Sequence, residues 1–432
     1  MSPPVAAATL CVDGVLLDGE PVGLRTAAGE IVELGQDVAP RAGDRVIDGR
    51  GLGAVPGLVN AHTHAAMTLF RGYADDLPLT EWLEQHIWPA EARLEADDVY
   101  WGTRLACVEM IRTGTTRFLD MYWHPEATAR AALDAGLRGV IGTPLIDLGD
   151  PERAGRVRAA ALESTALVED LANERIEPSL TPHAIYTVSE QSLRWVAEQS
   201  AARDLIVQIH LSETAREVDD CLATHGVRPA QYLDRVGLLG ERTVLAHCVH
   251  VDDSELDLIA ERGATIATNP AANMKLAVGG AFPYAAARAR NVRLGLGTDG
   301  PGSNNSLDLL ADAKLFALLQ KHASADAAAA PAHEVWRLAT GARSPLLAGR
   351  NMLAAGTPAD FLLVRTDSPE LSLGDLEAGL IYAASGSVVD TTVVAGQVLM
   401  SGGIVEGEAE IVAMARERAA RLGVARSTRR AP

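Results

Sequence analysis

The amino-acid sequence predicts an α/β fold: a (β/α)8 TIM barrel with a small composite β-sandwich domain formed by the N- and C-terminal segments. Two observations support this prediction. Eight apolar runs rich in Val, Ile and Leu alternate with helical segments through the middle of the 432-residue chain. Short β-like segments also lie at both ends, and each set is too small to stand alone as a sheet. No Gly-rich phosphate loop follows the first run, which disfavours an open doubly wound sheet.

The β-like segments at the two ends of the chain are separated by turn residues. Near the N-terminus they span residues 8–12, 15–17, 30–34 and 45–47, and near the C-terminus residues 360–365, 391–394, 397–400 and 403–406. We expect residues 1–56 and 355–410 to form one β domain, residues 57–354 the barrel, and residues 411–432 a C-terminal helix and tail. The basic stretch 427–430 has the composition of a solvated chain end.

The eight apolar runs predict the eight barrel strands in chain order. They span residues 57–64, 115–121, 138–146, 177–183, 205–213, 242–250, 264–270 and 292–300. Amphipathic segments between them, such as residues 103–112, 189–200 and 252–261, predict the covering helices. In such a barrel, functional side chains lie where the strands end.

Composition excludes several classes of partner. The net charge of −19 disfavours binding to nucleic acid or to an anionic membrane, because phosphate groups require a basic surface. The four cysteines are scattered and form no CxxC pair, which disfavours a cysteine zinc site and a disulfide framework. The sequence has neither a signal peptide pattern nor an apolar stretch of membrane-spanning length. We therefore expect a cytoplasmic protein.

The first run ends in a pair of histidines, His62 and His64. Residues two apart on a strand point to the same side, so both imidazoles can project from one strand end and chelate a divalent metal. Two ordinary histidines in a turn are the alternative. The remaining strand ends favour the metal site, because six of the eleven histidines fall there: His62, His64, His183, His210, His247 and His250.

A complete set of metal ligands follows from these strand ends. His62, His64 and His210 supply nitrogen donors, and Asp299 supplies an oxygen, which leaves a position open for water. Asp299 could also cap a helix, but it follows a very apolar strand. Bimetallic barrels of this kind commonly use a carboxylated lysine on the fourth strand, and residues 177–183 contain no lysine. We expect one divalent metal, zinc above all, although iron or manganese also suits these ligands.

Two further residues suit acid–base chemistry. A metal lowers the pKa of its bound water to about 7. Glu213 lies three residues after the ligand His210, where it can transfer a proton to a substrate atom. His247 can orient the attacking water and stabilise developing charge, whereas His250, beyond the strand, is more typical of a structural residue.

With these motifs in view, the chain resembles the amidohydrolase superfamily, and within it the 5-methylthioadenosine/S-adenosylhomocysteine deaminases. The resemblance covers nearly the whole chain. Its motifs are residues 56–73 (PGLVNAHTHAAMTLFRGY), 209–214 (IHLSET), 246–250 (AHCVH) and 297–307 (GTDGPGSNNSL). It implies one zinc on His62, His64, His210 and Asp299, and catalytic roles for Glu213, His247 and Asp299. Barrels of this family often pair, so a homo-oligomer is expected.

The resemblance also implies substrate-binding residues that spacing alone does not show. Glu91 corresponds to a glutamate that accepts hydrogen bonds from ribose hydroxyls, and His183 to a histidine that contacts the nucleoside. Without this resemblance, Glu91 would be interpreted as a carboxylate on the surface of a helix. Relatives that accept S-adenosylhomocysteine are expected to carry an arginine just after strand three, and residues 142–145 contain none. Arg153 or Arg156 could replace it, and the absence favours smaller 5′-substituents.

The expected reaction is hydrolytic deamination of a 6-aminopurine nucleoside to the inosine analogue and ammonia. Candidate substrates are 5-methylthioadenosine, 5′-deoxyadenosine, adenosine and S-adenosylhomocysteine. The metal-activated water attacks C6 while Glu213, which also contacts the substrate, protonates the adjacent ring nitrogen. The alternatives are aminodeoxyfutalosine, guanine-like or cytosine-like bases, and s-triazines. A dihydroorotase-type hydrolase and a non-enzymatic binding barrel are more distant alternatives.

Overall fold

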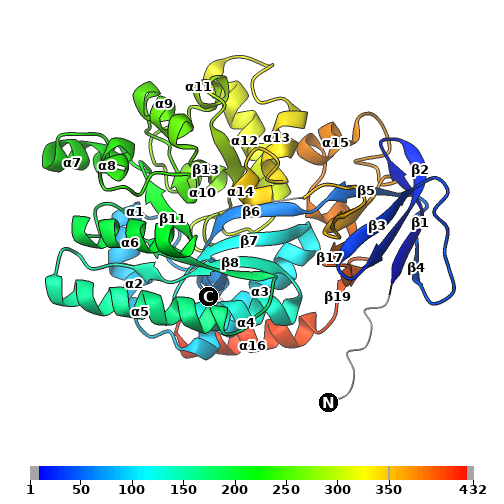
Figure 1. Ribbon diagram of the computed structural model, residues 1–432, viewed down its shortest axis with the longest axis horizontal. Coiled ribbons are helices and arrows are strands. Elements are labelled where there is room, and N and C mark those ends of the chain that lie inside the picture. Colours follow the sequence, from blue (N-terminus) through cyan, green and yellow to red (C-terminus); the bar gives the residue numbers. More distant parts are fainter. Residues whose placement is uncertain (1–8, 349–350, 426–432) are drawn as a thin grey trace, which may run out of the picture.

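The computed structural model describes residues 9–348 and 351–425, which form a barrel and an adjoining β domain (Figure 1). The barrel strands are parallel, with the spatial order β14-β13-β12-β11-β10-β8-β7-β6. They are β6 (Leu58–Thr63), β7 (Thr115–Met121), β8 (Arg138–Gly142), β10 (Ile176–Pro182), β11 (Ile206–Leu211), β12 (Thr243–His247), β13 (Thr265–Thr268) and β14 (Arg293–Leu296), with the short β9 (Pro144–Leu145) paired to β10. Each strand lies within, or within one residue of, its predicted run, so the predicted barrel is confirmed.

The barrel is closed where its last strand meets its first. Just beyond β14, the Asp299 amide donates to the His62 carbonyl over 3.1 Å, and the Thr298 amide donates to the Asn60 side chain over 3.1 Å. The interior below the strand ends is filled by apolar side chains from successive strands, including Val59, Leu119, Val140, Ile206 and Val244. Such parallel strands are buried on both faces, which explains why their sequences are continuous apolar runs.

Helices surround the barrel, and the three predicted amphipathic segments lie in α3, α6 and α9. The helical segments up to the fifth strand are η1 (Ala65–Phe70), α1 (Leu79–Glu81), the π-helical turn η2 (Trp82–Ile87), α2 (Trp88–Glu91), α3 (Ala96–Thr113), α4 (Pro125–Ala135), α5 (Pro151–Glu169) and α6 (Glu190–Arg203). The later ones are α7 (Ala215–His225), α8 (Pro229–Arg235), α9 (Asp253–Arg262), α10 (Pro270–Lys275), α11 (Tyr284–Ala289), α12 (Leu309–Ser324), α13 (Ala332–Ala339) and α14 (Pro345–Ala348).

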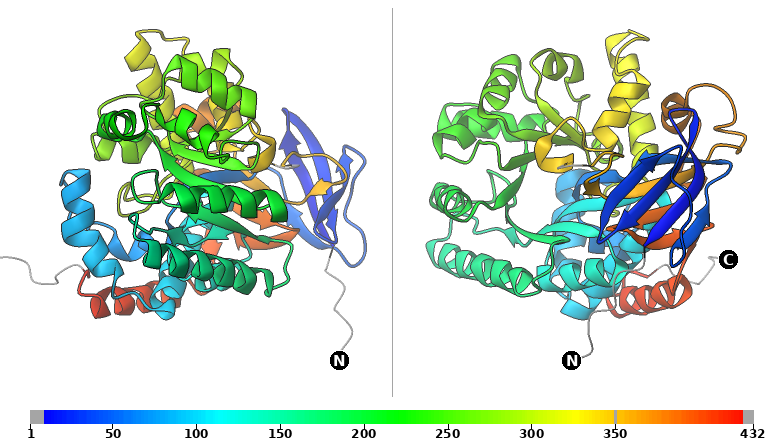
Figure 2. Two further views of the ribbon diagram at one scale, coloured as in Figure 1. Left: turned by 60° about the vertical axis from the view of Figure 1, so that its left-hand side comes forward. Right: turned by 45° about the vertical axis from the view of Figure 1, so that its right-hand side comes forward.

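The β domain beside the barrel combines both ends of the chain in one ten-stranded sheet, which confirms the predicted composite domain (Figure 2). Its strands are β1 (Leu10–Leu17), β2 (Glu20–Ala27), β3 (Glu30–Gly35), β4 (Arg45–Asp48), β5 (Leu52–Pro56), β15 (Thr357–Pro358), β16 (Phe361–Arg365), β17 (Val389–Val394), β18 (Gln397–Ser401) and β19 (Ile404–Val405). The two ends join through β5 and β16, which pair antiparallel from Pro56↔Phe361 to Leu52↔Arg365.

Three strands of this sheet were not among the predicted segments: β2, β5 and the two-residue β15. β2 contains Pro21 and Gly23, which weaken a strand pattern, yet it pairs with both β1 and β3. β5 runs almost directly into β6, so its apolar sequence merges with the first barrel run. The helix α15 (Leu376–Tyr382) and the turn η3 (Gly386–Val388) connect β16 to β17.

The C-terminal helix α16 (Glu408–Arg421) begins three residues before the predicted position and packs against α3. Its Ile411 and Ala415 are buried, and Arg421 forms ion pairs with Asp98 and Glu95 at the start of α3. The predicted basic stretch 427–430 lies outside the described residues. Across the described ranges, no helix combines the length and apolarity needed to cross a bilayer.

Candidate metal centre and active site

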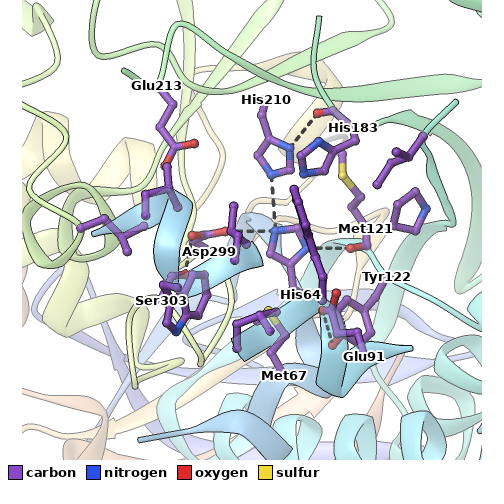
Figure 3. Close-up of a pocket in the computed structure, with 18 of the residues that line it drawn as sticks. His64, Met67, Glu91, Met121, Tyr122, His183, His210, Glu213, Asp299 and Ser303 are labelled. Carbon is purple, nitrogen blue, oxygen red and sulfur yellow. Dashed lines mark hydrogen bonds and ion pairs between the residues drawn. The ribbon is translucent and has the colours of Figure 1, made fainter. Parts of the chain in front are cut away.

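The carboxyl ends of β6, β11 and β14 bring four predicted ligands together. The donor atoms of His62, His64, His210 and Asp299 all lie within 4.8 Å of one another. Figure 3 shows three of these residues, His64, His210 and Asp299, at the cavity. Asp299 Oδ1 is 3.1 Å from His64 Nε2 and 3.5 Å from His62 Nε2, and His64 Nε2 is 3.4 Å from His210 Nε2. Three imidazoles and one carboxylate at this spacing match a catalytic zinc site with a free coordination position.

Backbone carbonyls orient two of the imidazoles toward this centre. His64 Nδ1 donates to the Met121 carbonyl over 2.6 Å, and His210 Nδ1 donates to the His183 carbonyl over 2.7 Å. Because each Nδ1 carries the hydrogen, each Nε2 keeps a free lone pair that faces the other ligands. Such a hydrogen bond to the distal nitrogen is the usual way in which a metal-ligating histidine is fixed.

His62 shows most clearly that the residues fit a metal ion. Its side chain is fully buried, and neither ring nitrogen has a hydrogen-bond partner among the residues that the structure describes. An unpartnered buried imidazole is costly unless another atom binds it, and a metal ion at Nε2 satisfies that nitrogen. Burial lowers the pKa of His62 to about 4, so the ring is neutral, as a ligand must be.

The Asp299 carboxylate favours positive charge on the neighbouring His64 imidazole. Burial alone would lower the pKa of His64, but the hydrogen bond to Asp299, the Asp299 charge and the hydrogen bond to the Met121 carbonyl together raise the pKa to about 9. A metal ion bound at Nε2 would displace that proton. The second carboxylate oxygen, Oδ2, accepts a hydrogen bond from the Ser303 hydroxyl. Just before Asp299, a side chain on Gly297 would overlap the Asn269 side chain and the His62 backbone, so glycine permits this close approach.

Glu213 and His247 lie beside the four ligands. Both are buried, and His247 Nδ1 is 3.9 Å from Glu213 Oε1. His247 Nδ1 also donates to the Asn273 side-chain oxygen over 2.8 Å, which leaves its Nε2 free to act toward the centre. Burial raises the pKa of the Glu213 carboxyl. A raised pKa favours the protonated form of the carboxyl, which suits a group that acts as an acid.

Three residues at this end of the barrel have left-handed backbones that residues other than glycine rarely adopt. The φ angles are 49° at Ser212, 70° at His247 and 58° at Asp299. Ser212 and Asp299 follow β11 and β14, and His247 is the last residue of β12. Such conformations persist only where the surroundings enforce them, and they concentrate at functional sites.

A cavity of about 700 Å³ opens above the cluster. Its walls are largely apolar and aromatic, with Trp82, Trp88, Trp123 and Tyr186 among them. The polar lining residues include His64, Glu91, His183, His210, Glu213, His247, Asp299 and Ser303. The structure therefore brings the residues of the predicted site together around one centre. All of them line the cavity except His62, which is more deeply buried in the ligand cluster.

Neighbouring side chains determine which hydrogen-bonding groups Glu91 and His183 can offer to a ligand. Glu91 accepts from the Tyr122 hydroxyl over 2.7 Å and from Trp123 Nε1 over 3.3 Å, which leaves lone pairs on both oxygens for a ligand. His183 Nδ1 is 2.9 Å from the hydroxyl of Thr187, which itself donates to a backbone carbonyl over 3.2 Å. His183 Nδ1 therefore carries the hydrogen, and its Nε2 is an acceptor.

A second cavity of about 960 Å³ adjoins the first. The two share Trp88, Glu91, Trp123 and Ile146, and the second also contains Arg153. Arg153 Nε donates to the Ile146 carbonyl over 2.8 Å. Arg156 is exposed and lines neither of these two cavities in the described chain. Of the two arginines considered from the sequence, the structure places Arg153 beside the site.

Sequence reasoning missed four residues that hold the site in place. Tyr122 and Trp123 bind Glu91, Asn273 binds His247, and Ser303 binds Asp299. Tyr122 directly follows the end of β7, so its position at a strand end was an available signal. The pairing of Asn273 with His247 had no signal in sequence spacing, because the partners are far apart in the chain.

Replacing Ser303 with alanine is expected to weaken metal binding. The loss of a hydrogen bond to a ligating carboxylate typically lowers metal affinity by about 10–100-fold. The measurement is a competition titration of the metal-free protein with a zinc chelator. Ser306→Ala, in the same loop, serves as the control and should bind as the wild type does. An unchanged metal affinity in Ser303→Ala would show that Asp299 binds the metal equally well without the hydrogen bond from Ser303.

Comparison with known proteins agrees with this geometry. The Amidohydrolase family model matches residues 54–399. A 5′-deoxyadenosine deaminase from Methanoregula boonei is 49% identical over 87% of this chain and 86% of its own length. A 5-methylthioadenosine/S-adenosylhomocysteine deaminase from Archaeoglobus fulgidus is 43% identical over 88% of this chain and 90% of its own length.

A solved structure shows the same architecture. The zinc-bound adenosine deaminase of Xanthomonas campestris superimposes with a TM-score of 0.88 and 33% identity, covering 96% of this chain and 98% of that one. The family match spans the barrel and the later strands of the β domain from β15 into β18, and the relatives match along most of their lengths. The chain belongs to the amidohydrolase family.

Proposed function

We propose that the protein is a metal-dependent deaminase that converts a 6-aminopurine nucleoside into its inosine analogue and ammonia. The observation that carries this proposal is the placement of Glu213 beside the four-ligand cluster, in a cavity that also presents Glu91 and His183. The relatives named 5′-deoxyadenosine deaminase and 5-methylthioadenosine/S-adenosylhomocysteine deaminase support the substrate class.

His62, His64, His210 and Asp299 are the residues that would hold one divalent metal ion. Zinc is favoured by the three nitrogen donors and by the zinc-bound relative from Xanthomonas campestris. When bound, such an ion acts as a Lewis acid and lowers the pKa of a water molecule to about 7. β10 carries no lysine to bridge a second ion, so we propose a single metal.

The remaining chemistry depends on proton transfers by the chain's own residues. The buried Glu213 carboxyl donates a proton to the ring nitrogen next to C6, which makes C6 more electrophilic. Asp299 accepts a proton from the attacking water, and His247 Nε2 stabilises the charge that develops on the oxygen added to C6. Asp299 then gives its proton to the departing ammonia, and Glu213 regains a proton from the hydroxyl on C6 as the C6 carbonyl forms. Because the cavity walls are largely apolar, these charges are poorly screened and their interactions are strong.

Glu91 favours a nucleoside over a free base. Its carboxylate accepts hydrogen bonds only, and Tyr122 and Trp123 hold it at the cavity wall with lone pairs to spare. Paired ribose hydroxyls supply the donors that such a carboxylate requires, whereas guanine-like bases and s-triazines have no ribose. Aminodeoxyfutalosine retains the nucleoside core and remains the second candidate within this class.

The second cavity provides room for a 5′-substituent. Its lining is largely apolar, which suits the methyl of 5′-deoxyadenosine or the thioether of methylthioadenosine. Arg153 is the one arginine among the residues that line this cavity, and its guanidinium group can form an ion pair with an amino-acid carboxylate. We expect Arg153→Ala to lower kcat/KM for S-adenosylhomocysteine by at least about 10-fold and to leave 5′-deoxyadenosine nearly unaffected. Arg156→Ala is the matched control, and equal loss on both substrates would contradict this assignment.

An ultraviolet assay tests the proposed function directly. Loss of adenosine absorbance is followed with adenosine, 5′-deoxyadenosine, methylthioadenosine and S-adenosylhomocysteine, with guanine and a chlorotriazine as comparisons. The proposal predicts turnover of at least one nucleoside and preference for small 5′-substituents. Turnover of guanine or the triazine alone would exclude the nucleoside class. The homo-oligomer and the cytoplasmic location stay predictions.

A further inference from the structure

The turn between β11 and α7 presents Glu213 to the site, and its backbone is restrained from two sides. On one side, the carbonyls of Leu211 and Ser212 accept from the amides of Cys248 and His250, each over 2.9 Å. These bonds tie the turn to the loop after β12. Ser212 has the left-handed φ of 49°, so the turn is held away from a relaxed conformation.

On the other side, a single carboxylate holds both amides of the turn. Glu217 Oε1 accepts from the Ser212 amide and Oε2 accepts from the Glu213 amide, each over 2.9 Å. The Glu217 residue is only 5% exposed. Both oxygens of one buried side chain therefore bind the backbone of the residue that carries the proposed acid, and of the residue before it.

The position of Glu217 on its helix shows that this arrangement is not ordinary helix capping. Thr214 is the N-cap of α7, and its hydroxyl accepts from the Glu217 amide over 3.2 Å. In a capping box, the carboxylate at the third helical position turns back to the N-cap amide. The Glu217 carboxylate instead reaches past Thr214 to the two preceding amides, where it restrains the active-site turn.

We propose that Glu217 is a positioning residue for the deamination reaction, whose carboxylate fixes the left-handed turn that aims Glu213 at the substrate. The inference rests on the proposed function for the identity of the reaction, but the restraint itself does not depend on the substrate. Without the carboxylate, two buried amides lose their acceptors and Ser212 can relax. Glu213 then moves relative to the metal ligands, which stay in place in and just beyond the barrel strands.

The geometry predicts a specific kinetic pattern. Glutamine at position 217 keeps one acceptor oxygen but turns an NH2 group toward the second amide, so only one restraint survives. Alanine removes both restraints. A misplacement of about 1 Å at a reacting group can cost about 100-fold in rate. We expect kcat to fall by roughly that factor in Glu217→Ala and by less in Glu217→Gln, with KM and metal content close to wild type.

The experiment compares the wild type with Glu217→Gln, Glu217→Ala and the control Asp219→Asn. Asp219 is exposed on the same helix, so its replacement removes an equal charge without touching the turn. Four quantities are measured on metal-loaded protein: kcat, KM, bound metal, and amide hydrogen exchange of the peptide that contains residues 211–214. We expect faster exchange in that peptide for both Glu217 variants, unchanged exchange in the barrel strands, and no change in Asp219→Asn.

The possible outcomes test the positioning role of Glu217 separately from the proposed function. Wild-type kcat in Glu217→Ala, or unchanged exchange in the 211–214 peptide, would overturn the positioning role. A loss of activity that follows loss of metal, or faster exchange throughout the barrel, would also overturn it and leave a purely structural role. If the wild type deaminates no adenosine-type nucleoside while exchange still rises only in this turn, the restraint stands and the proposed function falls.

Discussion

Replacing Glu213 with glutamine is expected to lower kcat by about 10⁴-fold while the bound metal stays in place. Glu213 is the buried carboxyl beside the ligand cluster, and burial raises its pKa, which favours the protonated form that a proton donor needs. Glutamine has nearly the same shape but has no acidic proton. Without the proton donor, the ring nitrogen must accept negative charge without neutralisation, which is unfavourable in a largely apolar cavity.

The measurement pairs the absorbance assay with metal analysis of the purified variant. Glu190→Gln, an exposed residue on α6, provides a control with the same chemical change far from the site and should keep wild-type kcat. Near-normal turnover in Glu213→Gln would show that another group supplies the proton. A variant that loses its metal would instead show that Glu213 belongs to the ligand set.

Replacing His62 with alanine is expected to abolish both metal binding and activity. Its imidazole is fully buried, and its ring nitrogens have no hydrogen-bond partner within the described chain, so a bound metal ion explains its position. A ligand that binds only the folded state adds about 2.7 kcal/mol of stability at 100 times its Kd. Zinc should therefore raise the melting temperature of the metal-free wild type and leave that of His62→Ala unchanged.

His250→Ala is the matched control for this prediction. His250 also follows β12, but its Nε2 is hydrogen-bonded to the Val278 carbonyl over 2.7 Å, away from the ligand cluster. Calorimetry with added zinc should show the stabilisation in this variant. If His62→Ala were stabilised by zinc as much as the wild type is, the proposed ligand set would be wrong.

The barrel and the ligand set could be predicted because they follow from short-range patterns. Strands buried on both faces, such as β11 and β12, are continuous apolar runs, and their ends are marked by His210 and His247. Once the runs are assigned to a barrel, all their carboxyl ends meet at one face. The convergence of His62, His210 and Asp299 follows from that topology alone.

The supporting contacts could not be predicted, because they depend on side-chain directions across long chain separations. Asn273 reaches His247 from α10, and Tyr122 reaches Glu91 from beyond β7. Neither pair has a characteristic spacing. The sequence around Glu217 is typical of a capped helix start, and only the structure shows that its carboxylate reaches past the cap. In the β domain, β2 was missed because Pro21 and Gly23 obscure a strand that its two neighbours stabilise.

The central claim is that a single metal ion on these four residues supports deamination of an adenosine-type nucleoside. A titration of the metal-free protein with zinc, in which ammonia release from 5′-deoxyadenosine is measured at each step, tests it most directly. We expect the rate to rise linearly and to reach its plateau at one zinc ion per chain. A plateau that requires a second equivalent, or the absence of ammonia release from every adenosine-type nucleoside at saturating zinc, would contradict it.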